Sequence, residues 1–504
     1  MKATHPRPTR GQQRGQAIVW FLATIAACCC VLALVYDVGQ VANKKEETVN
    51  AADAAALSGA MIEARMLNFQ AYANRARIAN EVTIAQLVST DSFLQYAATL
   101  SQNLATYISA IPIVGEFAGP VLQGIADGLQ YAQEGYQEAV PEIVQGLAVV
   151  QKALSLATDA AYASGANDAN NVAGNIASAN STTFGGRTDA TPQLVADAAA
   201  QLANQGAWLA FRDRGDDRTV PSQLVQDSRD QFAVQRDNSE AINLFNDSLE
   251  AGMLVASGGS DYIQFIKTSG QTKLQDFDHW AAQDSMDIQN NSCFLGVFCS
   301  SDFIDFVDMG YGRTDATANG EGQGDNLCYP GDTSPILGGP TWNCKNATDN
   351  GDSISSWSGI PVIHDIATGL SNKDPCTTNN GSDSPSLQFV MAVSKAGSST
   401  LSTQNLGFNN VAVGGAQGSP QMTDNLQNNN SLTAISAACV FFLRPDGKGV
   451  DPTRGALPRQ DGKHEFASLY NPYWQARLTA PDNTWKSAVY GLIGQGSLIP
   501  LATQ

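Results

Sequence analysis

A run of 21 residues without a charged side chain, QAIVWFLATIAACCCVLALVY at positions 16–36, constrains this chain more than any other feature. A helix of about 20 apolar residues crosses a hydrocarbon core of roughly 30 Å. Four basic residues and no acidic one precede the run, whereas positions 37–47 hold two basic and three acidic residues. An excess of basic residues marks the cytoplasmic flank. The sequence therefore predicts a cytoplasmic basic tail at 1–15 and a transmembrane anchor at 16–36.

Three other interpretations of the run remain open. A cleaved signal needs small residues at −3 and −1, and Gln40 before Ala42 or Asp37 before Gly39 fits that rule poorly. The segment 25–28 (IAAC) is similar to a lipoprotein cleavage site, but the residues that follow Cys28 stay apolar. A buried core helix is rarely this long and uncharged. We favour the permanent anchor.

The rest of the chain is acidic. The net charge of the 504 residues is −19, although the first 36 carry four basic side chains and no acidic one. Such a surface repels nucleic acid and anionic headgroups, so we expect no nucleic-acid partner. Two to four domains of ordinary size fit this length.

The cysteines fall into two groups. Cys28, Cys29 and Cys30 lie in the apolar run, and six others lie in the C-terminal half: Cys293, Cys299, Cys328, Cys344, Cys376 and Cys439. An even number in an exported region indicates disulfides, and six cysteines allow 15 connectivities. We expect neighbours to pair: Cys293 with Cys299, Cys328 with Cys344, and Cys376 with Cys439. Without CxxC pairs, and with few histidines, a zinc site is not expected.

Sequence patterning changes near residue 260. Helical spacing dominates before it, with an Ala-rich stalk at 37–111 and further helices expected at 121–165, 190–212 and 221–256 within a helical region 112–259. A Gly/Asn/Ser/Thr-rich link is expected at 165–191. Short strands are expected at 262–268, 388–394, 434–443 and 466–478, between long loops, in a β-containing distal domain 260–504. The predicted fold class is α+β: a transmembrane helix that continues into an α-helical stalk or bundle, then a disulfide-stapled, loop-rich domain.

One expectation concerns the length of the stalk helix. Unbroken from residue 16 to 111 it would reach roughly 140 Å at 1.5 Å per residue. The polar cluster 89–92 (STDS) has the residue types of an N-cap, so a second helix would start there, and Pro112 would end it. We therefore expect a break or fold-back near Asp91.

Catalytic signatures are not found. The sequence has no GxSxG elbow, HExxH, P-loop or GxGxxG fingerprint. His364 beside Asp365 is not a catalytic pair on adjacency alone. The segments 332–336 (DTSPI) and 346–351 (NATDNG) resemble metal sites in part, yet each lacks a required ligand. We expect no enzyme activity, no cofactor and no metal.

The N-terminus resembles a known family. Residues 14–17 (RGQA), the apolar run, 36–40 (YDVGQ) and above all 50–60 (NAADAAALSGA) are similar to the start of TadE/TadG-like proteins, which belong to the Tad machinery that assembles Flp-type (type IVb) pili. Two further segments, 67–82 (LNFQAYANRARIANEV) and 469–478 (LYNPYWQARL), resemble the longer TadG-like members. Pseudopilin-type members are cut after a glycine and carry glutamate at position five. Counted from Gly15, Trp20 stands at that position, which favours an uncleaved anchor.

The Ala-rich segment has a physical interpretation of its own. The helix-packing candidates are Ala52, Ala55, Ala56, Gly59 and Ala60. Small residues on one face let helices approach closely. Alternatively, alanine here simply favours helix.

The resemblance implies an inner-membrane accessory of Tad/Flp pilus biogenesis that acts structurally, with a cytoplasmic N-terminus and a periplasmic C-terminal domain. Its partners would be the membrane, the Tad/Flp machinery proteins and, through the stalk helix, a homo- or hetero-oligomer. The alternative is an exported adhesin or ligand-binding protein anchored to the envelope.

Overall fold

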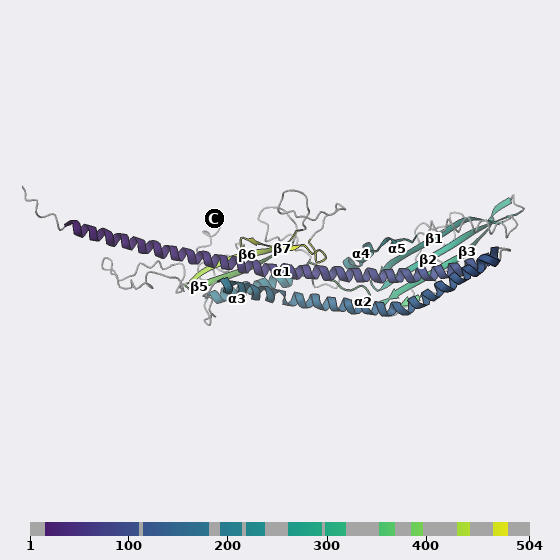
Figure 1. Cartoon of the computed structure of the whole chain (residues 1–504), viewed down its shortest axis with the longest axis horizontal. Coiled ribbons are helices and arrows are strands. Elements are labelled where there is room, and N and C mark those ends of the chain that lie inside the picture. The colour runs from purple at the N-terminus through teal and green to yellow at the C-terminus, as the bar shows by residue number, and fades with distance from the viewer. Residues whose placement is uncertain are drawn as a thin grey trace, which may run out of the picture. The chain divides into compact units, whose positions relative to one another are not determined.

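The structure is a computed structural model, and it describes ten stretches of the chain: 16–109, 114–180, 192–213, 218–236, 261–294, 298–318, 352–367, 385–396, 431–443 and 467–481. The chain forms two compact units (Figure 1). Unit 1 comprises Met1–Ala71, Ala160–Asp213 and Asp365–Gln504, and unit 2 comprises Tyr72–Asp159 and Arg214–His364. Each unit takes one part of each of two long helices and adds its own sheet. The units therefore interleave along the sequence, unlike the consecutive domains expected from composition.

The first helix, α1 (Gln16–Ser109), is one unbroken element of 94 residues. The expected break near Asp91 is wrong, because the polar cluster there does not cap a helix start. The hydroxyls of Ser89 and Thr90 donate to the carbonyl four residues earlier, a bond that helix interiors accommodate. Asp91 accepts a hydrogen bond of 2.9 Å from Thr314 on a strand. The cluster thus serves tertiary packing.

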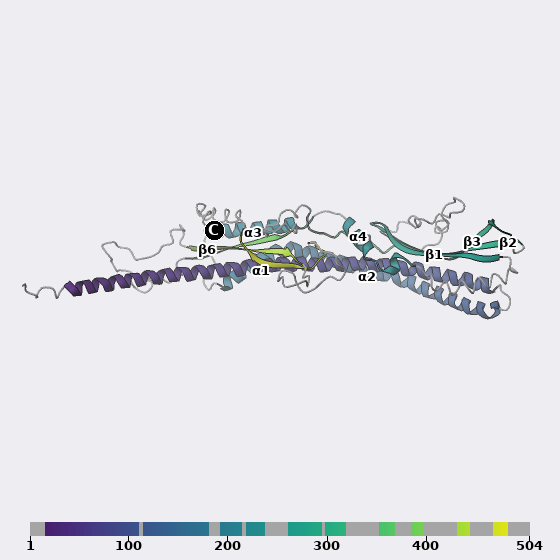
Figure 2. The ribbon, with the colours of Figure 1, turned by 90° about the horizontal axis from the view of Figure 1, so that it is seen from above.

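The second helix, α2 (Val114–Asn180), runs antiparallel to α1 (Figures 1 and 2). In unit 2 three hydrogen-bonded pairs show this order, since the residue number rises on α2 as it falls on α1: Gln102 with Gln130, Leu87 with Tyr136, and Arg77 with Gln151. A neighbouring helix explains why α1 can be so long. The expectation of a break, based on the length of α1, did not take this packing partner into account.

Part of the expected Gly-rich link is helical. Residues 165–180 belong to α2, and 181–191 lie outside the described residues. A Cβ at Gly165 would lie 2.7 Å from Cζ2 of Trp208, a side chain of α3 (Pro192–Phe211). The Trp208 ring stacks on Tyr162 with centroids 4.9 Å apart. Gly165 is therefore a packing residue, because only glycine leaves room for the indole.

The sheet of unit 1 is antiparallel in the order β5 (Leu387–Ala396), β6 (Ser431–Phe442), β7 (Trp474–Thr479). The first two strands agree with the ranges expected from sequence. The third begins only at Trp474, eight residues after its expected start at 466. The inward side chains of these strands join α1, α2 and α3 in one apolar cluster.

Unit 2 holds a second sheet, in the order β1 (Asp261–Asp276), β2 (His279–Phe294), β3 (Phe298–Thr317), β4 (Asp352–Ile354). β1 to β3 form an antiparallel meander, and β4 pairs parallel to β3. Two short helices, α4 (Thr219–Asp227) and α5 (Gln231–Val234), begin the helix expected at 221–256, and 237–260 lie outside the described residues. Sequence reasoning did not find the long strands β2 and β3, because polar residues occupy many of their buried positions and interrupt the hydrophobic alternation. The observed fold class is α+β.

Candidate functional site

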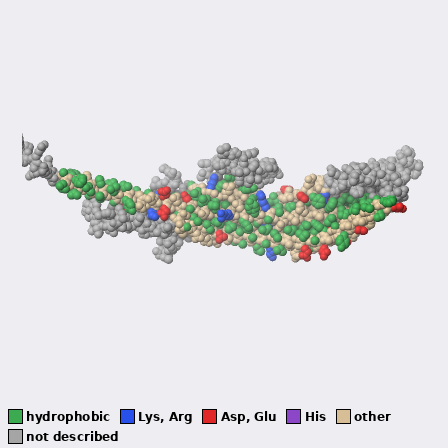
Figure 3. Space-filling view, viewed as in Figure 1, with side chains coloured by type: hydrophobic (Ala, Val, Ile, Leu, Met, Phe, Trp, Pro, Cys, Tyr) green, Lys and Arg blue, Asp and Glu red, His purple; other side chains and the backbone are tan. Residues whose placement is uncertain are grey.

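The anchor segment is apolar and exposed. Trp20 is 74% exposed and Val19 67%, and neighbouring apolar side chains are similarly open. Figure 3 shows hydrophobic side chains all along this end of α1. Among the described residues one helix, α1, is long and apolar enough to cross a membrane. In water such a surface would be unfavourable, whereas a bilayer covers it.

The hydroxyl of Thr24, in the middle of the anchor, forms its hydrogen bonds inside α1. Thr24 donates to the carbonyls of Trp20 and Phe21, at 2.8 Å and 2.9 Å. A hydroxyl bonded within its own helix needs no water, so it is tolerated in lipid. Cys28, Cys29 and Cys30 are free thiols.

Beyond the anchor, the Ala-rich stretch forms a seam that the chain itself covers. Four of the five helix-packing candidates, Ala52, Ala55, Ala56 and Ala60, have no exposed surface. At the fifth, Gly59, a Cβ would lie inside van der Waals contact with the ring of Phe389 on β5. We call this buried face, residues 51–60, the alanine seam. Small side chains are needed here because a sheet, not a second chain's helix, approaches the helix closely.

The other wall of the same cluster comes from α2 and the sheet. It includes a second row of small residues on α2 and apolar side chains from all three strands: Ala166, Ala169, Ala173, Ala177, Leu387, Met391, Val393, Ala438, Val440 and Trp474. The seam therefore serves packing within unit 1. The interaction surface that we expected it to offer another chain is occupied.

Asparagine side chains bind both edges of the unit 1 sheet. Asn68 of α1 donates to the carbonyl of Trp474 and accepts from its N–H, both at 2.9 Å. Asn204 of α3 makes the same pair of bonds with Val390, at 2.8 Å and 3.0 Å. β7 and β5 are the edge strands, whose free backbone groups would otherwise invite pairing with another chain. Each amide side chain replaces the missing neighbour at one position.

Asn68 and Trp474 belong to the two distant segments that resemble TadG-like proteins. Around Trp474 the contacts continue, with Phe211 and Phe442 rings each 5.6 Å from its centroid. The backbone N–H of Leu469 donates to Asp365 at 2.6 Å. Asp365 is thus engaged structurally, and no pairing with His364 is needed to explain it. Sequence reasoning identified both segments but not their contact.

Unit 1 also contains one carboxyl group in an apolar setting. Glu63, on α1 well beyond the anchor, is buried, and among the described residues its Oε2 has no hydrogen-bond partner. Burial raises the pKa of Glu63 to about 8. The side chain is therefore mostly protonated at neutral pH.

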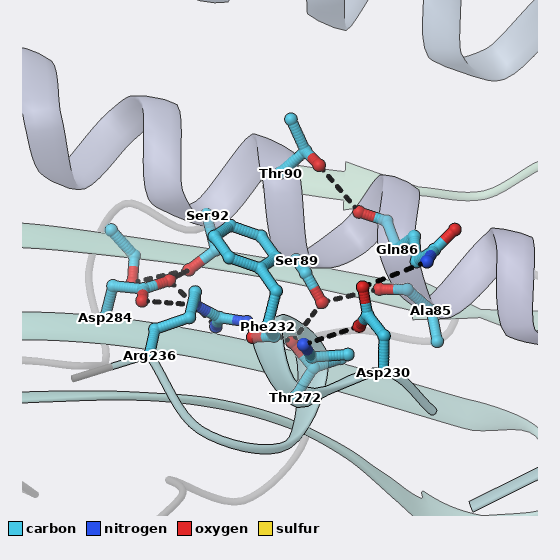
Figure 4. A network of polar contacts seen from close by, with 12 residues as sticks. Ala85, Gln86, Ser89, Thr90, Ser92, Asp230, Phe232, Arg236, Thr272 and Asp284 are labelled. Carbon is cyan, nitrogen blue, oxygen red and sulfur yellow. Dashed lines mark hydrogen bonds and ion pairs between the residues drawn. The ribbon is translucent and has the colours of Figure 1, made fainter. Parts of the chain in front are cut away.

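In unit 2 the contact between α1 and the sheet is polar (Figure 4). Asp284 of β2 forms an ion pair with Arg236 at 2.6 Å and accepts a hydrogen bond of 2.6 Å from Ser92 of α1. Both charged side chains are almost fully buried. Burial raises the pKa of Asp284, and the neighbouring guanidinium opposes this shift. Thr272 joins the network through Arg236 and through Ser89, at 2.9 Å and 2.6 Å.

A second buried group lies on the neighbouring strand. Asp315 accepts from Arg313 at 2.7 Å and lies 2.8 Å from Nε2 of His279. The carboxylate is thus enclosed by two basic side chains, an arrangement that suits a structural ion pair. Within the described residues, no three metal-ligating side chains converge. The segments 332–336 and 346–351 lie outside them.

Of the six cysteines expected to form disulfides, Cys293, Cys299 and Cys439 lie in described strands. In the β2–β3 ladder Cys293 stands opposite Cys299, so the register puts this predicted pair at facing positions. Directly opposed Cα atoms are about 4.5–5.5 Å apart, which lies within the range of disulfides. Cys439 is buried in β6, whereas Cys328, Cys344 and Cys376 lie outside the described residues. The staple is not shown, because no disulfide joins two of the side chains that are described; it stays a prediction.

The comparisons with known proteins agree with this geometry. Residues 15–61 match the family model described as Tad, putative Flp pilus-assembly TadE/G-like. No curated protein and no solved structure matches the chain. The matched segment begins one residue before α1 and ends one residue after Ala60, so it contains the whole anchor and the whole alanine seam. Residues 15–61, the anchor together with the alanine seam, are therefore similar to the TadE/G-like Flp pilus-assembly family.

Proposed function

We propose that the protein is an inner-membrane accessory of Tad/Flp pilus assembly that acts structurally and without catalysis. The single observation that carries this proposal is the coincidence of the family segment with two physical features. Residues 15–61 contain the exposed apolar anchor and the buried alanine seam. The match of residues 15–61 to a pilus-assembly family supports the pathway, and the exposed apolar anchor supports attachment to a membrane.

In this proposal the anchor and the seam have separate roles. The anchor holds the chain in the inner membrane with its N-terminus in the cytoplasm, as the basic tail favours. The seam fixes unit 1 onto the helix that leaves the membrane, so the exported region is carried on a continuous α1. Partner proteins of the Tad machinery would then be contacted by the exported surfaces.

Deletion of the gene in its native host tests the pathway. We expect Flp pili, counted by electron microscopy, to be lost and to return with the wild-type gene. A variant with the anchor replaced by an unrelated transmembrane helix of equal length should restore them, whereas one truncated after residue 36 should not. Normal piliation in the deletion strain would overturn the proposal.

Membrane topology has its own test. Alkaline phosphatase fused after residue 481 should be active, and a fusion after residue 15 should be inactive, because the enzyme folds only in the periplasm. Protease added to intact cells should leave the exported region uncut. Cleavage of the exported region in intact cells, together with normal piliation of the deletion strain, would instead support the surface-exposed adhesin.

A further inference from the structure

The helix α2 has two contrasting faces over residues 117–156, all within unit 2. One face packs inward through Ala126, Val140, Val144 and Gln151. On the other side large apolar side chains are open to solvent, with Phe117 78% and Tyr131 81% exposed; the others are Val121, Ile125, Ile143, Val149, Val150 and Leu156. Monomeric proteins rarely leave so many neighbouring apolar side chains uncovered. Among the described residues, nothing covers this face.

Five of these eight residues, Phe117, Val121, Tyr131, Val149 and Leu156, follow a helix-packing pattern together with four glycines. From Phe117 the positions 121, 124, 128, 131 and 135 succeed one another by alternating steps of four and three. At 3.6 residues per turn these positions form one stripe along the helix. The stripe resumes at 146, 149, 153 and 156 and lies opposite the buried face. We call it the outer stripe. Its spacing is that of a seam between two helices.

Among the described residues, no other part of the chain packs against the glycines of the outer stripe. At Gly124, Gly128, Gly135 and Gly146 a Cβ would meet nothing within 4 Å. Gly59 and Gly165 differ, because their missing side chains make room for Phe389 and Trp208. Glycine weakens a helix, so glycines without an internal contact need another cause. On a helix surface they allow the backbone of a second helix to come close.

From Val114 to Gln151 the charge on α2 has one sign, and the first basic residue, Lys152, follows near the end of the stripe. Exposed acidic residues lie beside or within the stripe, and no Lys, Arg or His occurs between Val114 and Gln151; the acidic residues are Glu116, Asp127, Glu134, Glu138 and Glu142. A second copy of the chain would bring like charges together, which is unfavourable. A helix with basic residues beside its apolar seam would complement both features.

We propose that the outer stripe of α2 docks an amphipathic helix of another protein, with small or apolar residues at its centre and Lys or Arg on its flank. The proposal uses only the described surface of unit 2, so it does not rest on the pilus role. Its occupant is defined by chemistry: the glycines require close helix approach, the exposed aromatic and aliphatic residues require an apolar seam, and the carboxylates require positive charge.

Binding of defined peptides to the full chain in neutral lipid discs tests this proposal. Two 28-residue helical peptides would share one Ala/Leu seam and differ only in Lys or Glu flanks, with empty discs as blank. We expect the Lys-flanked peptide to bind and the Glu-flanked one not to bind. Gly128→Leu with Gly135→Leu should weaken binding at least tenfold without changing any charge.

The matched control is Gly206→Leu on α3, where a Cβ also meets open space. It should leave binding unchanged. Phe117→Ser with Tyr131→Ser, which keeps the stripe glycines, should weaken binding as well. Equal binding of the Lys-flanked peptide by the wild type, Gly206→Leu and both double variants would mean that general charge attraction holds the peptide. That result would overturn the proposal. A wild-type dimer in sedimentation that the double glycine variant abolishes would also overturn it, since the occupant would then be a second copy.

Discussion

The same helix, α1, packs on a sheet in both units, and it does so by opposite means. In unit 1 the small side chains lie on the helix and the large one on the sheet: Gly59 and its alanine neighbours pack against the ring of Phe389. In unit 2 the small residues lie on the sheet instead: Gly310 and Gly312 of β3 pack against Tyr96 and Ser92 of α1. A Cβ at Gly312 would lie 2.6 Å from the backbone nitrogen of Tyr96. Close approach thus needs glycine on one side only.

The two contacts also differ in polarity. Unit 1 relies mainly on apolar burial, and its polar contacts are few: Ser436 of β6 donates to Asp53 of α1, and the two asparagines bind the sheet edges. Unit 2 joins helix and sheet through hydroxyls, carboxylates and the Arg236–Asp284 ion pair. Apolar burial is non-directional, whereas a hydrogen-bonded network fixes the register of helix and sheet. We therefore expect substitutions in the two units to differ in the size of their effect on stability and in the second change that restores it.

The largest effect should come from breaking the buried ion pair of unit 2. Arg236→Ala leaves Asp284 buried without its countercharge, which costs about 3–5 kcal/mol. Hydrogen exchange of β1 and β2 peptides should accelerate, while β5–β7 peptides keep their protection. The exposed Arg218–Asp278 pair is the control, since its contribution is about 0–1 kcal/mol. Equal effects of Arg236→Ala and Arg218→Ala would show that burial does not matter here.

A pH effect should distinguish unit 1. The folded-state pKa of Glu63 is about 8, above its ordinary value of 4.5, so the folded state holds the proton more tightly. Its stabilising contribution is complete below about pH 4.5 and is lost as the pH rises through 8, with a slope of about 1.4 kcal/mol per pH unit between them. Glu63→Gln should flatten this slope for β5–β7, as measured by hydrogen exchange at pH 5, 6.5 and 8.

The matched control is Glu63→Gln read out on β1–β3, where the pH profile should stay unchanged. A profile for β5–β7 that keeps its slope in the variant would assign the pH dependence to another group.

Sequence reasoning reached the apolar contact and missed the polar one for a physical reason. The alanine seam and strands β5 and β6 carry hydrophobic periodicity, and helix-packing residues 52–60 could be named in advance. In β2 and β3 many buried positions on both faces hold polar residues such as Asp284, Arg313 and Asp315, so the same rule finds no strand there. The residue types of Ser89 and Asp91 predict a helix cap, whereas in the structure their side chains contact the facing sheet. The contact between Asn68 and Trp474 spans 406 positions, and no local pattern encodes it.

A smaller effect should follow from filling the seam. Gly59→Ala places a methyl group against Phe389, and overpacking costs about 1–3 kcal/mol, offset in part by about 1 kcal/mol of helix propensity. Protection of β5 amides should fall modestly. Phe389→Leu in the same chain should recover it, because the ring that obstructs the methyl group is gone. If Gly59→Ala is stabilising on its own, the close approach of helix and sheet is not limiting.

The smallest local effect is expected at the sheet edge. Asn68→Ala leaves the N–H and carbonyl of Trp474 without their side-chain partners, at a cost of about 1–3 kcal/mol that water can reduce because the edge is only partly buried. Asn204→Ala should act alike at Val390 on the opposite edge. In both variants the amide of the edge residue should exchange faster while the β6 amides between them stay protected.

An edge without its asparagine also offers free backbone groups to other chains, so both variants should aggregate faster than wild type in light scattering. Asn68→Asp, which keeps only the acceptor, should aggregate at an intermediate rate. Loss of protection throughout β6 would mean that the asparagines support the whole sheet rather than close its edges, and the apolar cluster of unit 1 would then depend on polar bonds as unit 2 does.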